Sequence, residues 1–542
     1  MIRNVLARCG FFLFMAVLTF GILPAQAQTD PGLVVYPGPS GATRNSTYTV
    51  QVRKEGGTWQ NLFCYGTNAG QHVGRGTQTS VVYFDADFSS RIEVQVVKAS
   101  GTVTGVRIRP TSYGMQFTRN GNTVSFFMDR PRKLSIEFNG DIYNNLQVFA
   151  NPLEVNPPKQ GNAGVTYFGP NVANAGTINL TSNQTLYLAG GAVVTANVTI
   201  NNSSNVKILG RGILVQGTSR YGIGTTGSSN VTIDGIIIFN ERQQWTVVPA
   251  TTNDIIINNV KLLCAEIYSD GIDPCSCQRL VISDCFIRSG DDDISIKARG
   301  SSPNTDITVK NTILWGDGAH GVLIGPEGSG AITSAITFDS IDVLEVNCPA
   351  GAEWWGVVGI TCSGNVTMRD MTFKNFNIDN FTLSELFNIR IESNQYVSTP
   401  GAAIRNIKYI NWSYTGPNTN SNLIQGYDAT RTVDSVYFIN LRINGNLVLN
   451  AAQAKCQIGS NAFHIFFQPG PTEIQNQATA QRGINASSGE ARIFIPGQIF
   501  QLPARYNGMK VYSLQGRMLA PEAEWYGFAG QQVSKFTGII LK

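Results

Sequence analysis

Five carboxylates and a histidine stand close together near the middle of this 542-residue chain. They occur in three glycine-containing motifs: Asp270-Gly271-Ile272-Asp273, Gly290-Asp291-Asp292-Asp293 and Gly318-Ala319-His320-Gly321. The flanking sequence alternates Val and Ile with polar residues, so the acids interrupt strands. Neighbouring carboxylates cannot all ionise easily, so at least one is expected to keep its proton. Two carboxyl groups with different pKa values are what hydrolysis of a glycosidic bond requires.

A repeat in the surrounding sequence predicts how these motifs come together. Apolar–polar–apolar triplets recur every 24 to 29 residues, with weaker repeats later in the chain. This period predicts a right-handed parallel β-helix with three short strands in each coil. Equivalent positions of successive coils then lie about 4.8 Å apart. Asp270, Asp291 and His320 should therefore form a patch on one side of three consecutive coils. The triplets begin at Val206, Val231, Ile255, Leu280, Ile307 and Ile336, and the weaker ones at Val366, Ile407 and Val436.

Some of these residues also have simpler interpretations. Asp residues at the turns of a β-helix commonly cap backbone groups, and we expect this role for Asp293 and allow it for Asp273. An acidic run could alternatively bind calcium, although a catalytic patch is favoured and no metal or cofactor is predicted. Lys297, which follows the acids, could contact substrate hydroxyl groups or a neighbouring acid.

Four aromatic residues near the acids are candidates for stacking on sugar rings: Tyr268, Trp315, Trp354 and Trp355. Trp245, one coil earlier, is a fifth. Packing in the core is the alternative for any single one. A Trp-Trp pair in a region of low charge is more consistent with ligand contact than with burial.

The rest of the chain predicts an all-β protein in several parts. Residues 1–27 have the charged, apolar and small-residue regions of a signal peptide. Residues 28–153 carry short alternating strands and an Asn120-Gly121 hairpin turn, which predict an N-terminal β-sandwich. The β-helix is expected over 154–455. Residues 456–542 break the period and resemble the small C-terminal β module that directs type IX secretion.

Composition narrows the partners and the location. Charged residues make up 14% of the chain and the formal net charge is +4, without a basic block that would indicate nucleic acid. After residue 27 no 18-residue segment is apolar enough to insert into a membrane. We expect a secreted monomer. The clustered cysteines, Cys264, Cys275, Cys277 and Cys285, lack the usual zinc spacing, so buried thiols or disulfides are favoured.

The three motifs together resemble those of the polygalacturonase clan, glycoside hydrolase families 28 and 49. Family 28 carries Asn-Thr-Asp, Gly/Gln-Asp-Asp and Gly-His-Gly, whereas here Ser269 replaces Thr and Ala319 replaces a glycine. The resemblance implies an inverting hydrolase. It makes Asp292 the general acid, with Asp270 and Asp291 positioning and deprotonating the attacking water, and it places His320 at the substrate.

The sequence departs from family 28 where that family binds the galacturonate carboxylate. Arg-Ile-Lys is expected on the coil after the histidine motif, but 355–361 contains no such pair, and 388–391 has Arg390 without the lysine. The sandwich segments 106–110, 133–138 and 148–152 resemble family 49, which acts on neutral α-glucans. We therefore expect an endo-acting, dextranase-like enzyme that binds a polysaccharide. The alternatives are a polygalacturonase-like pectin hydrolase and a non-catalytic carbohydrate-binding protein.

Overall fold

The computed structural model describes residues 31–70, 77–348, 355–382, 385–417, 421–470 and three short strands near the C-terminus. The expected signal peptide and Trp354 lie outside these residues. The described residues contain strands and one short 3-10 turn, η2 (Thr111–Tyr113), with no α-helix. Nothing in the described part of the chain is a helix long and apolar enough to cross a membrane. The all-β prediction is confirmed.

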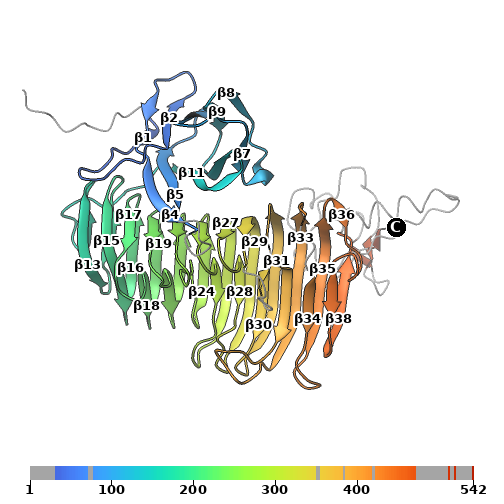
Figure 1. Cartoon of the computed structure of the whole chain (residues 1–542). Coiled ribbons are helices and arrows are strands. Elements are labelled where there is room, and N and C mark those ends of the chain that lie inside the picture. The colour runs from blue at the N-terminus through green and yellow to red at the C-terminus, as the bar shows by residue number, and fades with distance from the viewer. Residues whose placement is uncertain are drawn as a thin grey trace, which may run out of the picture.

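The N-terminal part is a sandwich of two sheets, drawn in blue to blue-green in Figure 1. Its apolar core lies between them and includes Val50, Val94 and Leu134. The hairpin expected at Asn120-Gly121 is present, with Asn120 opposite Thr123. One sheet contains β1 (Leu33–Val35), β5 (Thr77–Ala86), β11 (Asp141–Pro152), β10 (Arg132–Phe138), β7 (Val106–Arg109) and β4 (Tyr65–Ala69), and the other β3 (Gln60–Asn61), β2 (Tyr48–Lys54), β6 (Ile92–Lys98), β9 (Thr123–Met128) and β8 (Phe117–Asn120).

The chain then forms a parallel β-helix whose strands stack along one axis, with the sandwich over its N-terminal half (Figure 1). The parallel strands run from β12 to β38, and β36 (Asn446–Leu447) is a short antiparallel addition. They are β12 (Val165–Phe168), β13 (Val172–Leu180), β14 (Thr185–Leu188), β15 (Val193–Asn201), β16 (Ser204–Gly210), β17 (Ile213–Gln216), β18 (Ile223–Thr226), β19 (Ser229–Asp234), β20 (Ile237–Asn240), β21 (Val247–Ala250), β22 (Asn253–Asn258), β23 (Lys261–Cys264), β24 (Gln278–Ser283), β25 (Phe286–Ser289), β26 (Ile294–Ile296), β27 (Asn304–Gly316), β28 (Val322–Ile324), β29 (Ile332–Val346), β30 (Gly356–Cys362), β31 (Thr367–Ile378), β32 (Glu385–Ile391), β33 (Ala403–Tyr414), β34 (Asn422–Gln425), β35 (Val433–Ile443), β37 (Cys456–Ile458) and β38 (Ala462–Gln468).

The predicted triplets are in register from coil to coil. Each of the six strong triplets pairs with the next, from Val206 through to Ile336. The predicted position of the weaker triplet, Val366, is wrong by five residues, because Ile336 pairs with Met371. The helix also continues past the expected end at 455, since β37 and β38 form a further coil.

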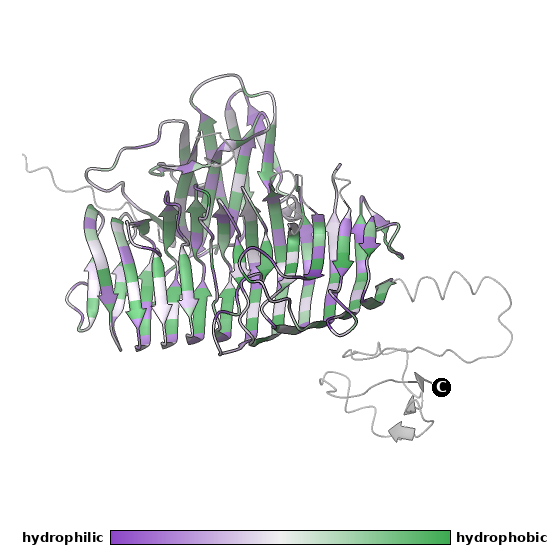
Figure 2. Ribbon diagram, turned by 60° about the horizontal axis from the view of Figure 1, so that its bottom comes forward, coloured by the Kyte–Doolittle hydropathy of each residue, from purple (hydrophilic) through white to green (hydrophobic). Residues whose placement is uncertain are grey.

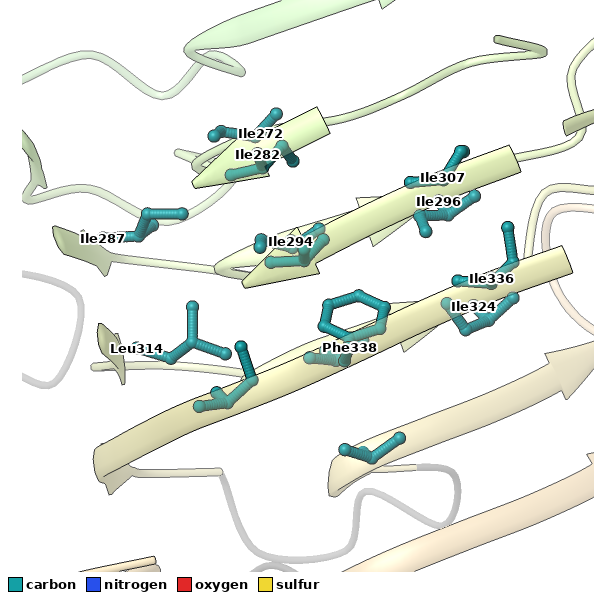
Figure 3. Close-up of a cluster of buried hydrophobic side chains, with 14 of the residues drawn as sticks. Ile272, Ile282, Ile287, Ile294, Ile296, Ile307, Leu314, Ile324, Ile336 and Phe338 are labelled. Carbon is teal, nitrogen blue, oxygen red and sulfur yellow. The ribbon is translucent and has the colours of Figure 1, made fainter. Parts of the chain in front are cut away.

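Rows of aliphatic side chains fill the interior of the helix. Ile272, Ile294 and Ile296 lie in such rows (Figure 3), and all are at most 1% exposed. Apolar and polar residues alternate along many strands (Figure 2), because successive side chains point to opposite faces. The C-terminal module is described only as β39 (Val511–Tyr512), β40 (Met518–Ala520) and β41 (Ile540–Leu541), which pair antiparallel.

The sandwich is held on the helix by a buried apolar and ionic interface. Phe149 of the sandwich packs against Phe286 of the helix, with ring centroids 5.2 Å apart. The guanidinium of Arg109, which is fully buried, lies 3.2 Å from Glu137 and 3.1 Å from Glu345 of β29. Breaking a buried ion pair leaves an uncompensated charge, which is strongly destabilising. The two parts are therefore firmly joined.

Candidate active site

The strand register aligns the candidate residues in a single row. Ile272, Ile294 and Val322 occupy equivalent positions in three successive coils. Asp270, Asp292 and His320 each precede one of these residues by two positions. Val247 and Ile223 are the equivalent residues one and two coils upstream. Trp245 and Tyr221 precede them by two positions and so extend the row. We call these residues the site row: Tyr221, Trp245, Asp270, Asp292 and His320.

The predicted patch is therefore present, with one difference in its register. Asp292 and not Asp291 is the member of the row, and Asp291 stands one position before it at the turn. Glycine is required beside the acids because the backbone of neighbouring coils comes close. A methyl group on Gly290 would lie 2.1 Å from the carbonyl oxygen of Glu266, and one on Gly271 would lie 2.5 Å from that of Asp293.

Lys297 contacts three acids, one of which is Asp270 of the site row. Its Nζ lies 3.0 Å from both Asp270 Oδ2 and Asp273 Oδ1, and 3.7 Å from Glu327 Oε1. It also lies 3.5 Å from the centre of the Trp245 ring, a cation–π contact. Burial lowers the pKa of Lys297, but these carboxylates outweigh it and hold the pKa well above its ordinary value. Of the two predicted roles for Lys297, contact with acid neighbours is the one observed.

Asp292 is paired with His320. Its Oδ1 lies 2.6 Å from the ring Nδ1 of His320 and accepts a second hydrogen bond, 3.3 Å long, from the His320 backbone N–H. Burial raises the pKa of Asp292, but the charge and hydrogen bonds of His320, together with Lys297, hold it below its ordinary value. Asp292 is therefore kept as a carboxylate.

Asp291 has the opposite electrostatics. It is half-buried and its Oδ2 accepts a 3.2 Å hydrogen bond from the backbone N–H of Tyr268, whose side chain is 57% exposed. Burial and the neighbouring charges of Asp270 and Asp292 raise the pKa of Asp291 well above its ordinary value. Asp291 therefore keeps its proton at a pH where Asp292 has lost its own.

Two residues near the acids are structural. Asp293, as predicted, acts as a cap, because its Oδ1 accepts hydrogen bonds from the backbone N–H and the hydroxyl of Ser289, 3.1 and 2.7 Å long. The substrate-binding prediction for Trp315 is wrong. Its side chain is fully buried under the sandwich, its Nε1 donates to Asp317, and the Arg288 guanidinium lies 4.2 Å from the ring centre. The sequence did not indicate that this strand faces the sandwich.

The four clustered cysteines are separate thiols. Cys264, Cys275, Cys277 and Cys285 are all buried and unbridged, as one of the two favoured interpretations expected. Cys264 Sγ lies 3.2 Å from the hydroxyl of Thr246. Burial raises the pKa of Cys264 to about 12, so the thiol stays protonated and unreactive. Within the described residues no group of three or more His, Cys, Asp or Glu side chains is arranged to hold a metal ion.

Aromatic residues surround the row, some of them unexpected. Trp355 is half-buried with its ring centroid 5.5 Å from that of His320. Tyr221, which the sequence analysis missed, stacks on Trp245 with centroids 6.1 Å apart. Tyr396, also missed, is 52% exposed, and partial burial raises its pKa, with the nearby acidic groups of Asp291, Glu327 and Asp292 adding to the increase. No sequence signal marked Tyr396, because it lies on a loop more than two coils beyond the motifs.

The coil after His320 carries small residues where family 28 would supply cations. Gly359 of β30 lies opposite Leu323 of β28, and Thr361 follows two residues later on the same strand. A methyl group on Gly359 would lie 2.9 Å from Cδ2 and 3.1 Å from Nε2 of His320. The imidazole ring therefore occupies the space that a longer side chain would need.

Comparison with known proteins gives short sequence matches. Residues 191–348 match the model of glycosyl hydrolases family 28. A polygalacturonase from Ralstonia nicotianae is 29% identical over 128 residues, 22% of this chain and 24% of that protein. A probable polygalacturonase from Vitis vinifera is 26% identical over 170 residues, 29% of this chain and 33% of that protein. The chain thus spans a quarter to a third of the length of these relatives.

Comparison of structures covers much more of the chain. Dex49A from Penicillium minioluteum aligns with a TM-score of 0.55 at 16% identity over 78% of this chain and 96% of its own. A family 28 exopolygalacturonase from Yersinia enterocolitica aligns with a TM-score of 0.42 at 11% identity over 70% and 96%. The match to Dex49A is one of fold. The family 28 match over residues 191–348 confirms the resemblance to the polygalacturonase clan in that part of the chain.

Proposed function

We propose that this protein is an exported, inverting glycoside hydrolase that cleaves internal bonds of a neutral α-glucan such as dextran. The observation that carries the hydrolase assignment is the site row, in which Asp270, Asp292 and His320 align in successive coils beside Asp291. Two neighbouring carboxyl groups, one protonated and one ionised, are the minimum that acid–base cleavage of a glycosidic bond requires.

The pKa directions favour Asp291 as the general acid, in place of Asp292, which the resemblance implied. Asp291 protonates the glycosidic oxygen as its bond to the anomeric carbon breaks. Asp292, held ionised by His320, takes a proton from a water molecule whose oxygen bonds to that carbon from the other side. One water is thereby added across the bond. Asp270, paired with Lys297, orients the water with Asp292.

The lack of a side chain at Gly359 is an argument for an uncharged substrate. A uronate ring at the cleavage point would need a charge-assisted partner. The glycine beside the His320 ring and Thr361 after it supply none, while the next coil offers Arg390 already paired with Glu392 at 3.1 Å. The aromatic rings of Tyr221, Trp355 and Tyr396 suit the apolar faces of uncharged sugars.

A pectin hydrolase is the second candidate, because the curated relatives are named polygalacturonases. Release of reducing ends from dextran, pullulan and polygalacturonate separates the two. We expect faster cleavage of dextran, with weak salt dependence because no array of ion pairs forms with the substrate. A clear preference for polygalacturonate would show that the pectin assignment is correct. The Asp291→Asn variant serves as the inactive control.

A further inference from the structure

A groove separate from the site row lies between the sandwich and the β-helix, on the side of β27, β29 and β31. One wall is formed by η2 and by the turn between β9 and β10. The strand that leads into η2, β7, lies above β27 and β29 in Figure 1. The other wall is formed by the corner at which each of the three helix strands bends. The groove has a volume of about 590 Å³, within the range of about 300–1,000 Å³ for ligand sites.

The groove and the site row lie at opposite ends of the strand segment that faces the sandwich. In β27 this segment, 312–316, contains Trp315, which is buried against residues of the sandwich. Asn311 lines the groove just before the segment, and the turn that carries His320 follows it. An extended chain from Asn311 to Asp317 spans roughly 20 Å. A ligand in the groove is therefore well separated from the catalytic acids.

Hydrogen bonds between the sandwich and the helix hold the two walls in place. Ser112 Oγ of η2 donates a 2.6 Å hydrogen bond to Asp342 Oδ1 of β29, and the Thr111 backbone N–H donates one of 3.2 Å to Asp379 Oδ2. Asn377 Nδ2 of β31 donates a second bond, 3.2 Å long, to Asp342 Oδ1. The groove is therefore formed before a ligand binds, and binding does not have to order its walls.

The helix wall repeats polar side chains from coil to coil. Asn311, Ser340 and Asn375 occupy the same corner position in three successive coils, each with a left-handed backbone φ between 49° and 59°. Asp342 and Asn377, two residues after this corner, are opposite each other. Of these residues Asn311, Ser340 and Asn377 are exposed, so a ligand can reach them. Successive coils lie about 4.8 Å apart, so a chain along the helix axis meets an amide or hydroxyl group at each coil.

The sandwich wall supplies hydrogen-bond donors. Asp129 accepts two 3.2 Å hydrogen bonds from the guanidinium of Arg130 and one of 3.3 Å from that of Arg132. The Arg132 guanidinium also lies 4.8 Å from the centre of the Tyr113 ring, a cation–π contact that orients it. A guanidinium has five N–H groups, so both arginines keep further donors after bonding to this one carboxylate.

This combination of donors and acceptors favours an uncharged ligand rich in hydroxyl groups. A hydroxyl group both donates and accepts, so it can bond to the amides and to Ser340 on one wall and to the arginines on the other. A carboxylate only accepts, and it would face the acid Asp342 across the groove. Asp129 already offsets part of the positive charge of Arg130 and Arg132. A neutral sugar avoids the repulsion and can use both walls.

We infer that this groove is a second, non-catalytic binding site for a neutral saccharide chain, with Arg130, Ser340 and Asn377 among its contact residues. The inference goes beyond the proposed function, because it does not depend on the acids of the site row. Binding in the groove keeps a polysaccharide attached to the enzyme on the far side of the sandwich-facing strands from the cleavage point.

A double substitution tests the groove. Arg130→Ala with Asn377→Ala removes one contact residue from each wall. Both side chains are exposed and Asp342 keeps its bond from η2, so the fold should be retained. The matched control is Arg91→Ala with Asn61→Ala, which removes an exposed, ion-paired arginine and an exposed, hydrogen-bonded asparagine of the sandwich outside the groove.

Calorimetry counts the binding sites for a short dextran oligosaccharide. Asp291→Asn and Asp292→Asn are present in every protein, so hydrolysis is prevented whichever of the two is the acid. The groove variant should bind one oligosaccharide fewer than the control, or bind it about 10- to 100-fold more weakly, the effect of about two hydrogen bonds. Equal site numbers and affinities in the two variants would overturn the groove site, and so would the absence of any binding.

Oligogalacturonate tests the class of ligand. The groove variant and the control should bind it equally, because the groove is not expected to hold an acidic sugar. A loss of oligogalacturonate binding confined to the groove variant would overturn the neutral-saccharide assignment. Hydrolysis of dextran by the wild type is measured separately. Hydrolysis with no difference between the variants refutes the groove site alone, and a difference between them without hydrolysis refutes the proposed function alone.

Discussion

The substitution Asp291→Asn should remove the proton donor and leave the fold intact. Asn keeps the size of the side chain and an oxygen that can accept the hydrogen bond from the Tyr268 backbone N–H. Because this hydrogen bond is kept and no ion pair within the described residues involves Asp291, we expect little change in the free energy of unfolding. Loss of general acid catalysis costs about 10²- to 10⁴-fold in kcat, or about 2.7 to 5.4 kcal/mol of barrier.

The pH profile of the wild type follows from the two pKa directions. Activity should fall at low pH as Asp292 gains a proton, below the ordinary pKa of an aspartate, because His320 stabilises the carboxylate. It should fall at high pH as Asp291 loses its proton, well above that ordinary pKa, because burial and two nearby carboxylates disfavour its ionisation. Asp291→Asn should abolish the alkaline limb and keep the acid limb.

An activated substrate distinguishes the two acids. A dinitrophenyl glycoside has a leaving group that needs no protonation, so Asp291→Asn should recover most of its activity on it, whereas Asp292→Asn should stay impaired. Initial rates of both variants on dextran and on the dinitrophenyl substrate are the assay. Recovery of Asp292→Asn together with persistent loss in Asp291→Asn would refute the reasoning and restore Asp292 as the acid.

Other expected outcomes follow from the same geometry. Trp315→Ala should lower the free energy of unfolding in urea by about 3–5 kcal/mol through loss of buried packing and leave KM unchanged; a raised KM with normal stability would contradict its structural role. Gly359→Ala should displace the His320 ring and reduce kcat about 10- to 100-fold, whereas Gly105→Ala, with nothing within 4 Å, should be neutral. NMR of the first product should show the anomer opposite to the substrate, and retention would exclude inversion. Dextran viscosity should fall faster than reducing ends accumulate if cleavage is internal, and parallel curves would indicate exo action.

The sequence alone determined the class of fold and the approximate place of the site. The triplet spacing predicts coils because the same strand of every coil must bury its apolar side chains. The apolar triplet of that strand therefore recurs once per coil. That is why Val206 to Ile336 are in register, and why Asp270, Asp292 and His320 meet. The repeat length predicts strand positions less well where the loops between strands are longer, as before Val366. A loop on the surface can gain residues without changing which residues are buried, so the spacing of the triplets is no longer fixed there.

Only the tertiary structure decided which residues of the motifs can do chemistry. Asp291 and Asp292 are adjacent and identical in type, and their pKa values diverge because one faces two carboxylates while the other contacts His320 across a coil. Trp315 and Trp355 are likewise indistinguishable in sequence, yet one lies under the sandwich and the other beside His320. Both distinctions depend on neighbours that are distant along the chain. A single sequence shows which residues are able to interact. The pKa of a side chain and its burial depend on which residues the fold brings into contact with it.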